Sequence, residues 1–592
     1  MNEEPDNLKK QPGSTRHYFV AWLVLVGATF MILLITMLFG SGGPRSLTDW
    51  LAPALFLLVN SLIVATVVIG VWVVGRWLLC LRNLRWLLLA GGCVLGLIAL
   101  FYAEEDWRGW HTWNRFQRAW EAKGQHFTLA GVVPPKVPDD ENFALTPIVF
   151  TSYGHVLTRE GKPIPDDKRD EHFVVRMRTP ISLNAPAPTN CAGDRVKGTV
   201  TRLDCWQGYY RDVAGKPDAF PVPAQPQSPA ADVLLALSNY DGVIEELRSA
   251  CRLPYSRYPI NYDSDSPWLI MLPHLAVLKS CAQCLQLRGS AHLQNGQPDK
   301  ALDDVQLALQ LTDKISNEPI LISYLVRIAM VQFVLQPIWE GLTEHKWSDA
   351  QLTALEAGLA KLDFLAAWQL SMRSELGFQN DTMRLLRRHP GKLRELDIMR
   401  DPSGNPIDLG VPPGLLVHLI PAGWFYQNQY RCARVMEDYY IPAVDLTQRT
   451  FSPELAWCGE AVIKTEMKTA SPFNRFERLL LPWLNTGASK FAYGTASVDL
   501  ARTAIALERY RLAHGAYPES LDALAPQFIA QVRHDVIGGG PLKYRREADG
   551  SYALYSIGWN MKDDGGEAAF NKEGAVDIQN GDWIWRCRVK AG

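Results

Sequence analysis

The chain has 592 residues, with 60 Lys and Arg against 62 Asp and Glu, so its formal net charge is only -2. This balance leaves no basic surplus for non-specific nucleic-acid binding, and we expect no nucleic-acid partner. The length predicts two or three folded units rather than one core. The 20 Trp residues cluster near expected bilayer interfaces, which indicates a membrane protein rather than a cytosolic one.

Three apolar runs fill the beginning of the chain, at residues 18–39, 50–74 and 86–102. A helix needs about 20 apolar residues to cross the hydrocarbon core of a bilayer, and the third run is near the lower limit. A cleaved signal peptide is the alternative for the first run, but that run is too long and another follows almost at once. We predict that residues 1–102 form a three-helix transmembrane anchor.

Charged residues around these runs predict the orientation of the chain. Basic residues precede the first run and lie between the second and third, whereas acidic residues follow the third. Because positively charged loops stay in the cytoplasm, we expect a multi-pass protein of the inner (cytoplasmic) membrane with a cytoplasmic N-terminus and a periplasmic bulk. The residues are Lys9, Lys10, Arg16, Arg76, Arg82 and Arg85 on one side and Glu104, Glu105 and Asp106 on the other.

Residues 103–230 are expected to hold an aromatic helix followed by a proline-rich segment. Trp107, Trp110, Trp113, Phe116 and Trp120 recur at helical spacing, which places them at the headgroup level or against the folded body. After them prolines become dense and helical periodicity disappears. Residues 173–178 and 198–202 alternate like short strands.

Residues 231–486 are predicted to form an α-helical body. Within it, Gly296, Pro298 and Asp299 form a turn between two amphipathic helices over residues 287–311. This segment resembles one tetratricopeptide-type hairpin, with its buried face formed by Ala301, Leu302, Val305 and Leu309. One hairpin is not an array, so a compact helical bundle or irregular solenoid is expected.

Eight of the ten cysteines lie after the apolar runs, where an oxidising compartment permits disulfides. Eight cysteines allow 105 pairings, and the local pairs Cys191–Cys205 and Cys432–Cys458 are the first to test. The alternative, that several are buried small apolar residues, stays open. The Cys281-x-x-Cys284 pair lies inside a helical run, which favours buried thiols or a bond to Cys251 over redox chemistry.

Catalytic motifs are missing: there is no His-Glu-x-x-His, no Gly-x-Ser-x-Gly and no phosphate-binding Gly-x-x-x-x-Gly-Lys-Ser/Thr. We therefore expect no enzymatic activity. The alternative is a cell-envelope enzyme that uses carboxylates of the body, such as Asp263, Asp265 or Glu375. Side chains of this kind are more often solvated, so their convergence on one pocket is required before an enzyme is inferred.

The end of the chain has the most recognisable pattern. A helical run over residues 499–514 is followed by Gly515, a Tyr517-Pro518 turn, two strand-like segments and the Lys562-Asp-Asp-Gly-Gly566 loop. This order resembles the globular end of type II secretion major pseudopilins. The resemblance implies that residues 487–592 form a small α+β module in which a long helix packs on an antiparallel sheet.

In that family a loop after the second strand binds calcium. The residues in the corresponding loop are Asn560, Asp563, Asp564 and Asp577, with Ser556 near its start. Calcium takes six to eight oxygen ligands, which carboxylates and loop carbonyls supply. The alternative is an acidic turn held by its own glycines and side-chain hydrogen bonds.

This chain departs from pseudopilins because it lacks their processing site, and its module follows three apolar runs and a helical body. Filament assembly is therefore not expected. The overall layout, including Asn142-Phe-Ala-Leu-Thr-Pro147, is similar to uncharacterised membrane proteins of planctomycete and verrucomicrobial bacteria. We expect a membrane-anchored periplasmic binding or scaffold protein with a protein partner in the envelope or a secretion apparatus. A calcium site that only stiffens the last loop, without a partner, is a further alternative.

Overall fold

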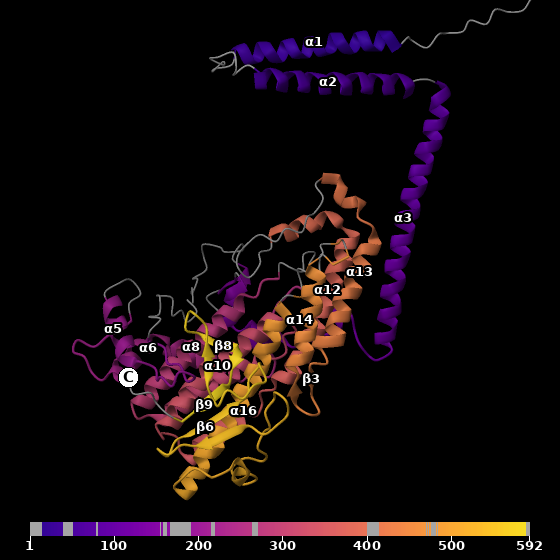
Figure 1. Cartoon of the computed structure of the whole chain (residues 1–592). Coiled ribbons are helices and arrows are strands. Elements are labelled where there is room, and N and C mark those ends of the chain that lie inside the picture. Colours follow the sequence, from indigo (N-terminus) through magenta and orange to yellow (C-terminus); the bar gives the residue numbers. More distant parts are fainter. Residues whose placement is uncertain are drawn as a thin grey trace, which may run out of the picture. The chain divides into compact units, whose positions relative to one another are not determined.

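The computed structural model describes residues 15–39, 51–78, 81–153, 155–157, 163–165, 191–214, 220–262, 270–398, 414–468, 471, 473–474, 481 and 483–587. The chain divides into two compact units, residues 1–104 and 105–592. It is mainly helical, at 65%, with a few small antiparallel sheets near the C-terminus (Figure 1). The expected mixed class, dominated by helices, is confirmed at this level.

The first unit contains α1 (Thr15–Phe39), α2 (Leu51–Leu78) and the first part of α3 (Leu81–Glu121). α1 and α2 form an antiparallel pair, because Tyr18 stacks edge-on with Trp72 at 5.3 Å and Trp22 donates a hydrogen bond to Thr66. The three predicted apolar runs are therefore helical, and the third helix continues well beyond residue 102.

Within the described part of the chain, four helices are long and apolar enough to cross a membrane. Three of them are α1, α2 and α3, in which 6%, 11% and 0% of the most apolar window is buried by protein. The fourth, α10 (Leu321–Thr343), has 67% of its window buried. Its apolar surface is thus covered by the folded body, which explains its composition without a membrane.

The second half of α3 belongs to the second unit and packs there through aromatic residues. Trp113 is buried and contacts Phe127 edge-on at 5.5 Å. Gly109 meets Gly423 of α13 (Ala422–Val435), where an added Cβ would lie 2.3 Å from the Gly423 carbonyl oxygen. Trp107 is 63% exposed. Some aromatic side chains of the expected helix are therefore buried against the second unit, and others are exposed.

The segment after α3 is built of short elements. A two-stranded antiparallel sheet pairs β1 (His155–Leu157) with β2 (Pro163–Pro165), and α5 (Leu203–Val213), α6 (Pro229–Leu237) and α7 (Asp241–Ala250) follow. The predicted strand at 173–178 lies outside the described residues. The predicted strand at 198–202 is instead one side of a tight turn, in which an isolated antiparallel bridge joins Thr199 to Asp194 before α5 begins.

The helical body follows. α8 and α9 pack on each other across a short connection, with Pro298 opening α9 and Ala301 fully buried. Ser348 caps α11 with a full capping box. The elements are α8 (Pro273–Gln294), α9 (Pro298–Asp313), α10, α11 (Asp349–Leu359), α12 (Phe364–Arg388), α13, the π-helix η11 (Met436–Tyr440), the paired strands β3 (Val444–Asp445) and β4 (Thr450–Phe451), and α14 (Pro453–Met467).

The last part of the chain places a long helix against a small sheet, visible in yellow in Figure 1. α16 (Trp483–His514) contacts β6 (Tyr552–Ser556) and β9 (Trp583–Arg586), and β5 (Lys543–Arg546) completes an antiparallel sheet of order β5-β6-β9. A separate hairpin joins β7 (Ala568–Phe570) and β8 (Val576–Gly581). β6 is buried along its whole length.

One hydrophobic core extends from Trp113 to Trp585, through the helical body and the C-terminal sheet. α16 carries much of this continuity, because Phe491 packs on Trp368 of α12 while Tyr493 packs on Trp583 of β9. The finer boundaries at residues 230 and 486 stay predictions, since the two compact units are divided only between residues 104 and 105.

Candidate functional site

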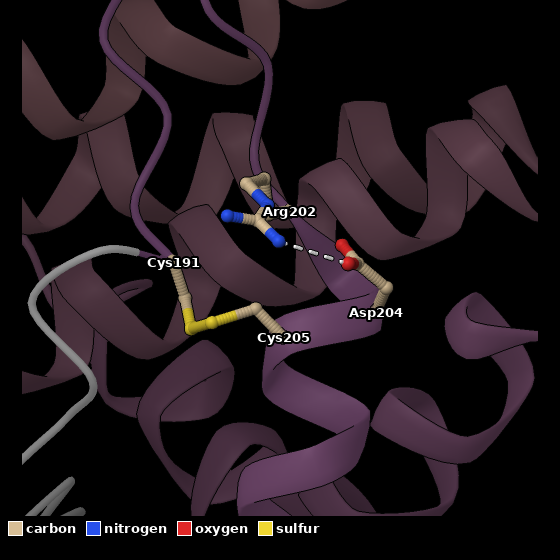
Figure 2. Close-up of a disulfide and its surroundings, with 4 residues drawn as sticks. All are labelled: Cys191, Arg202, Asp204 and Cys205. Carbon is tan, nitrogen blue, oxygen red and sulfur yellow. Dashed lines mark hydrogen bonds and ion pairs between the residues drawn. A yellow bond between two sulfur atoms is a disulfide. The ribbon is translucent and has the colours of Figure 1, made fainter. Parts of the chain in front are cut away.

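A loop closed by a disulfide bond lies in the second unit. Cys191 and Cys205 form a disulfide with their Cα atoms 5.5 Å apart, as the short spacing predicted (Figure 2). Arg202 returns a backbone hydrogen bond to the Cys191 carbonyl, and its side chain pairs with Asp204 at 3.1 Å. The start of α5 is thereby tied to the beginning of the loop.

Between the two cysteines the chain makes a tight turn. Asp194 and Thr199 exchange two backbone hydrogen bonds of 2.9 Å, and Gly198 supplies the left-handed conformation (φ +73°) that closes the turn. The Asp194 carboxylate accepts the backbone N–H groups of Val196 and Lys197. This turn holds Arg195 rigidly and directs its side chain into the protein.

Arg195 is only 6% exposed. Its Nη2 donates to Gln332 Oε1 at 2.6 Å and to the hydroxyls of Tyr493 and Ser497 at 3.2 Å, while Nη1 lies 3.5 Å from the Ile584 carbonyl oxygen. All four acceptors are neutral. Among the described residues no ion pair joins Arg195 to a carboxylate.

The C-terminal sheet also contacts this side chain. The Arg195 guanidinium lies 5.3 Å from the ring centroid of Trp585, which is buried on β9. Aromatic rings attract cations through their quadrupole. Arg195 thus connects a loop near residue 195 with α10, α16 and the last strand of the chain.

Two side chains of α10 hold the loop in place. Gln336 accepts from the Arg195 N–H at 2.8 Å and donates to the Thr199 carbonyl, and Glu340 Oε1 accepts from both the N–H and the hydroxyl of Thr201. Burial raises the pKa of Glu340, although these hydrogen bonds oppose the effect. Gly193 is required here, since a Cβ would lie 2.4 Å from Gln336 Nε2.

A cavity of about 600 Å³ opens beside Arg195. Its walls come from the loop, α5, α8, α10, α16 and β8, so it joins parts of the chain that are far apart in sequence. Among its described lining residues there is no histidine or cysteine. They are Ala192, Gly193, Asp194, Arg195, Val196, Lys197, Thr201, Trp206, Gln283, Gln286, Leu287, Gln332, Phe333, Gln336, Tyr493 and Val576.

The predicted calcium ligands lie in two places. Asn560 and Asp564 contact each other at 2.9 Å, and Asp563 pairs with Lys543 at 3.3 Å while accepting the Gly565 N–H. Asp577 lies on β8, where it accepts from Gln579 and Asn580. In the described part of the chain no group of three or more His, Cys, Asp or Glu side chains is placed to hold a metal ion. Calcium binding stays a prediction.

Two aspartates that the sequence did not single out organise this loop. Asp582 is buried and accepts the backbone N–H groups of Asp564 and Gly566. Asp535 accepts from the Ser556 hydroxyl at 2.7 Å and from the Ile557 N–H. Burial raises the pKa of both carboxyl groups, against these hydrogen bonds. In this structure the Ser556 hydroxyl is a hydrogen-bond donor to the buried Asp535.

Of the three carboxylates of the enzyme alternative, the structure describes Glu375. Asp263 and Asp265 lie outside the described residues, so their convergence with Glu375 stays untested. Glu375 accepts the Leu321 N–H at the start of α10, and burial raises its pKa to about 7. Glu318 accepts from Ser323 on the same first turn. Both glutamates thus accept hydrogen bonds from the first turn of α10, where the N–H groups have no partner within the helix.

The free cysteines contradict one predicted disulfide and agree with the prediction of buried thiols elsewhere. Cys432 and Cys458 are free, with Cys432 buried and Cys458 exposed, so their predicted pairing is not present. Cys251, Cys281 and Cys284 are also free and buried, which agrees with the reading as apolar thiols rather than with a bond to Cys251. Burial raises the pKa of Cys251 and of Cys281 to about 12.

The chain matches no protein-family model, no curated protein and no solved structure. Its site must therefore be interpreted from its own geometry.

Sequence reasoning missed Arg195, because a single arginine in a proline-rich segment carries no motif. The one available signal was the Cys191–Cys205 pair that frames it. A short disulfide loop containing Gly193 and Gly198 indicates a backbone held in a compact turn, and such loops often carry functional residues.

Proposed function

We propose that this protein is a non-enzymatic binding protein anchored in the inner membrane of a bacterial envelope, with residues 105–592 on the periplasmic side. The observation that carries the proposal is the cavity beside Arg195. It has the volume usual for ligand pockets, about 300–1,000 Å³. Its polar side chains are amides, hydroxyls and one buried guanidinium, which suit binding more than bond cleavage.

The location is supported by two separate observations. The first three helices are apolar and little covered by protein, and the basic residues between them follow the positive-inside pattern. The Cys191–Cys205 disulfide in the second unit fits an oxidising compartment. An inner-membrane anchor with a periplasmic body accounts for both.

Topology reporters test the location. Alkaline phosphatase, which is active only after export, and a fluorescent protein that matures only in the cytoplasm are each fused after Gly592. We expect activity from the phosphatase fusion alone. Phosphatase activity that stays at the level of a cytoplasmic control, together with fluorescence, would place the body inside and end the proposal.

The partner is proposed to be a protein of the envelope, and the resemblance of residues 497–585 to pseudopilins makes a secretion apparatus the first candidate. The arrangement of α16 on β6 and β9 agrees with the helix-on-sheet layout of that resemblance. A tetratricopeptide-type role for α8 and α9, which would offer a protein-binding face, belongs to the same proposal.

Site-specific photo-crosslinking in cells tests the partner. A photoreactive residue replaces Lys197, whose side chain is 42% exposed at the cavity, and in a matched control it replaces Lys464 of α14, 67% exposed. We expect a reproducible crosslink to one envelope protein at position 197 and none of that product at position 464. The same products at both positions would indicate non-specific capture.

Calcium at Asn560, Asp563, Asp564 and Asp577 is a separate part of the proposal. A metal that binds only the folded state raises the unfolding temperature. Thermal unfolding of the full chain in detergent is compared with calcium and with a chelator, for the wild type and for Asp564→Asn. If the wild type unfolds at the same temperature with calcium and with the chelator, the proposed calcium site is refuted.

A carboxylate-based envelope enzyme is the second candidate, because burial raises the pKa of both Glu375 and Glu437 to about 7. General acids and bases work best with pKa values near the working pH. Glu437 lies on a π-helix, an element frequent at functional sites. A hydrolase substrate panel on the purified chain, repeated with Glu437→Gln, tests it; activity unchanged by the substitution excludes this site.

A further inference from the structure

The side chains that line the cavity beside Arg195 indicate the chemical class of its ligand. We propose that it binds a small organic monoanion with peptide-like groups, whose carboxylate is held by Arg195 and whose amide or carbonyl groups are held by the surrounding glutamines. This inference rests on the proposed binding function and specifies the ligand class of the same site.

The charges that line the cavity point to a monoanion. Its charged lining residues in the described chain are Asp194, Arg195 and Lys197. Lys197 pairs with Asp194 at 3.6 Å, so the cavity wall keeps the one positive charge of Arg195. Arg195 is buried and, within the described chain, its hydrogen bonds reach only neutral acceptors. A buried cation without an anion is unfavourable, and an incoming carboxylate compensates it. The planar guanidinium also matches a carboxylate geometrically.

The backbone of the loop disfavours phosphate. Phosphate sites usually present several free N–H groups from a turn or helix start. Here the N–H groups of residues 194–199 are all bonded inside the protein: to Thr199, Gln336, the Asp194 carboxylate, and carbonyls within the turn. The loop therefore supplies one guanidinium and no cradle of N–H groups.

Amide side chains supply the second half of the site. Gln283 and Gln286 lie three residues apart on α8 and thus share one face of the helix. Neither side chain forms a hydrogen bond to another described residue. Gln332 on α10 uses its oxygen for Arg195, while its buried Nε2 has no hydrogen-bond partner among the described residues. An amide can donate and accept at once, which is the pattern that peptide groups need.

Titration calorimetry on the full chain in detergent tests the proposal with three probes: N-acetyl-tri-alanine, which is a monoanion, its neutral C-terminal amide, and inorganic phosphate. We expect heat of binding from N-acetyl-tri-alanine and at least tenfold weaker binding of the amide. Equal binding of both peptides overturns the role of the carboxylate. Binding of phosphate alone overturns the ligand class, and so does the absence of binding by every probe.

Two kinds of variant assign the binding to this cavity. Arg195→Gln is expected to abolish the binding of N-acetyl-tri-alanine, but it also removes contacts to Ser497 and Trp585 and can weaken the fold. Gln286→Ala removes a half-buried side chain that forms no hydrogen bond to another described residue, so we expect binding to weaken about tenfold while the unfolding temperature changes little. Gln306→Ala, at a second cavity between α9 and α11, is the control.

The calorimetric results test the ligand, and the topology reporters test the location of the protein, so the two proposals can fail separately. Unchanged binding in Gln286→Ala, or an equal loss in Gln306→Ala, overturns the placement of the ligand. If the topology reporters instead place the body in the cytoplasm, the proposed function fails while the calorimetric result still stands as a property of the cavity.

Discussion

His345 and Glu508 lie 163 positions apart, yet His345 Nδ1 is 2.9 Å from Glu508 Oε1. Glu508 is buried on α16 and also accepts from Arg511 and from the Tyr517 hydroxyl, each at 2.8 Å. The Tyr517 oxygen in turn lies 3.4 Å from Cys587 Sγ. This carboxylate therefore ties the end of α10 and the Tyr-Pro turn to α16.

Replacement of Glu508 by Gln is expected to lower the free energy of unfolding by about 3 kcal/mol at neutral pH. Burial alone would raise the pKa of Glu508, but the hydrogen bonds from His345, Arg511 and Tyr517 outweigh it and lower the pKa to about 2. A lowered carboxyl pKa adds stability above its unfolded value of 4.5, and this stability disappears as the pH falls toward 2. Denaturant unfolding at neutral and acid pH measures the difference, which should shrink in acid.

Replacement of Glu375 by Gln is expected to raise the free energy of unfolding. Burial raises the pKa of the Glu375 carboxyl to about 7, so the folded wild type loses stability as the pH rises from 4.5 through 7. Gln keeps the carbonyl that accepts the Leu321 N–H but cannot ionise. We expect the variant to be more stable than the wild type by about 2 kcal/mol near pH 8 and similar near pH 5. Glu573→Gln on the surface is the control and should change neither value.

Removal of the Cys191–Cys205 disulfide by substitution of both residues with Ser should lower stability by about 3 kcal/mol. The bond closes a loop with a sequence separation of 14, and it restrains the turn that carries Arg195. Non-reducing thiol labelling of the unfolded wild type should find these two cysteines protected and Cys432 and Cys458 reactive. The Cys458→Ser variant should unfold like the wild type.

Gly423→Ala should weaken the packing of α3 on α13. An added Cβ would lie 2.0 Å from the Glu105 carbonyl oxygen, and backbone cannot easily move there. We expect a loss of about 1–3 kcal/mol, as for other overpacked sites. Gly208→Ala on α5 is the matched control, because nothing lies within 4 Å of its Cβ and Ala favours a helix by up to about 1 kcal/mol. Thermal unfolding of the two variants should shift in opposite directions.

Features carried by neighbouring residues were predictable from the sequence. The apolar runs form α1, α2 and α3 because continuous apolar residues specify a helix locally. The break between α8 and α9 follows from Gly296, with φ +70°, and from Pro298 at the first helical position.

Pairings between distant residues were not predictable in this way. The proposed bond between Cys432 and Cys458 failed, although their spacing is moderate, because Cys432 is buried while Cys458 faces outward. Hydropathy alone would also count α10 as a membrane span. Only its packing against α8 and α16 shows that its apolar surface is covered by protein.

The local sequence thus determined that the apolar runs are helical, where α8 ends and α9 begins, and the short disulfide loop, since these depend on hydrogen bonds and side chains a few residues apart. The tertiary structure alone decided the candidate site. Arg195 acquires its neutral partners, its aromatic neighbour and its cavity only when α10, α16 and β9 converge on it. Burial of that charge depends on contacts across almost the whole second unit, which no local pattern encodes.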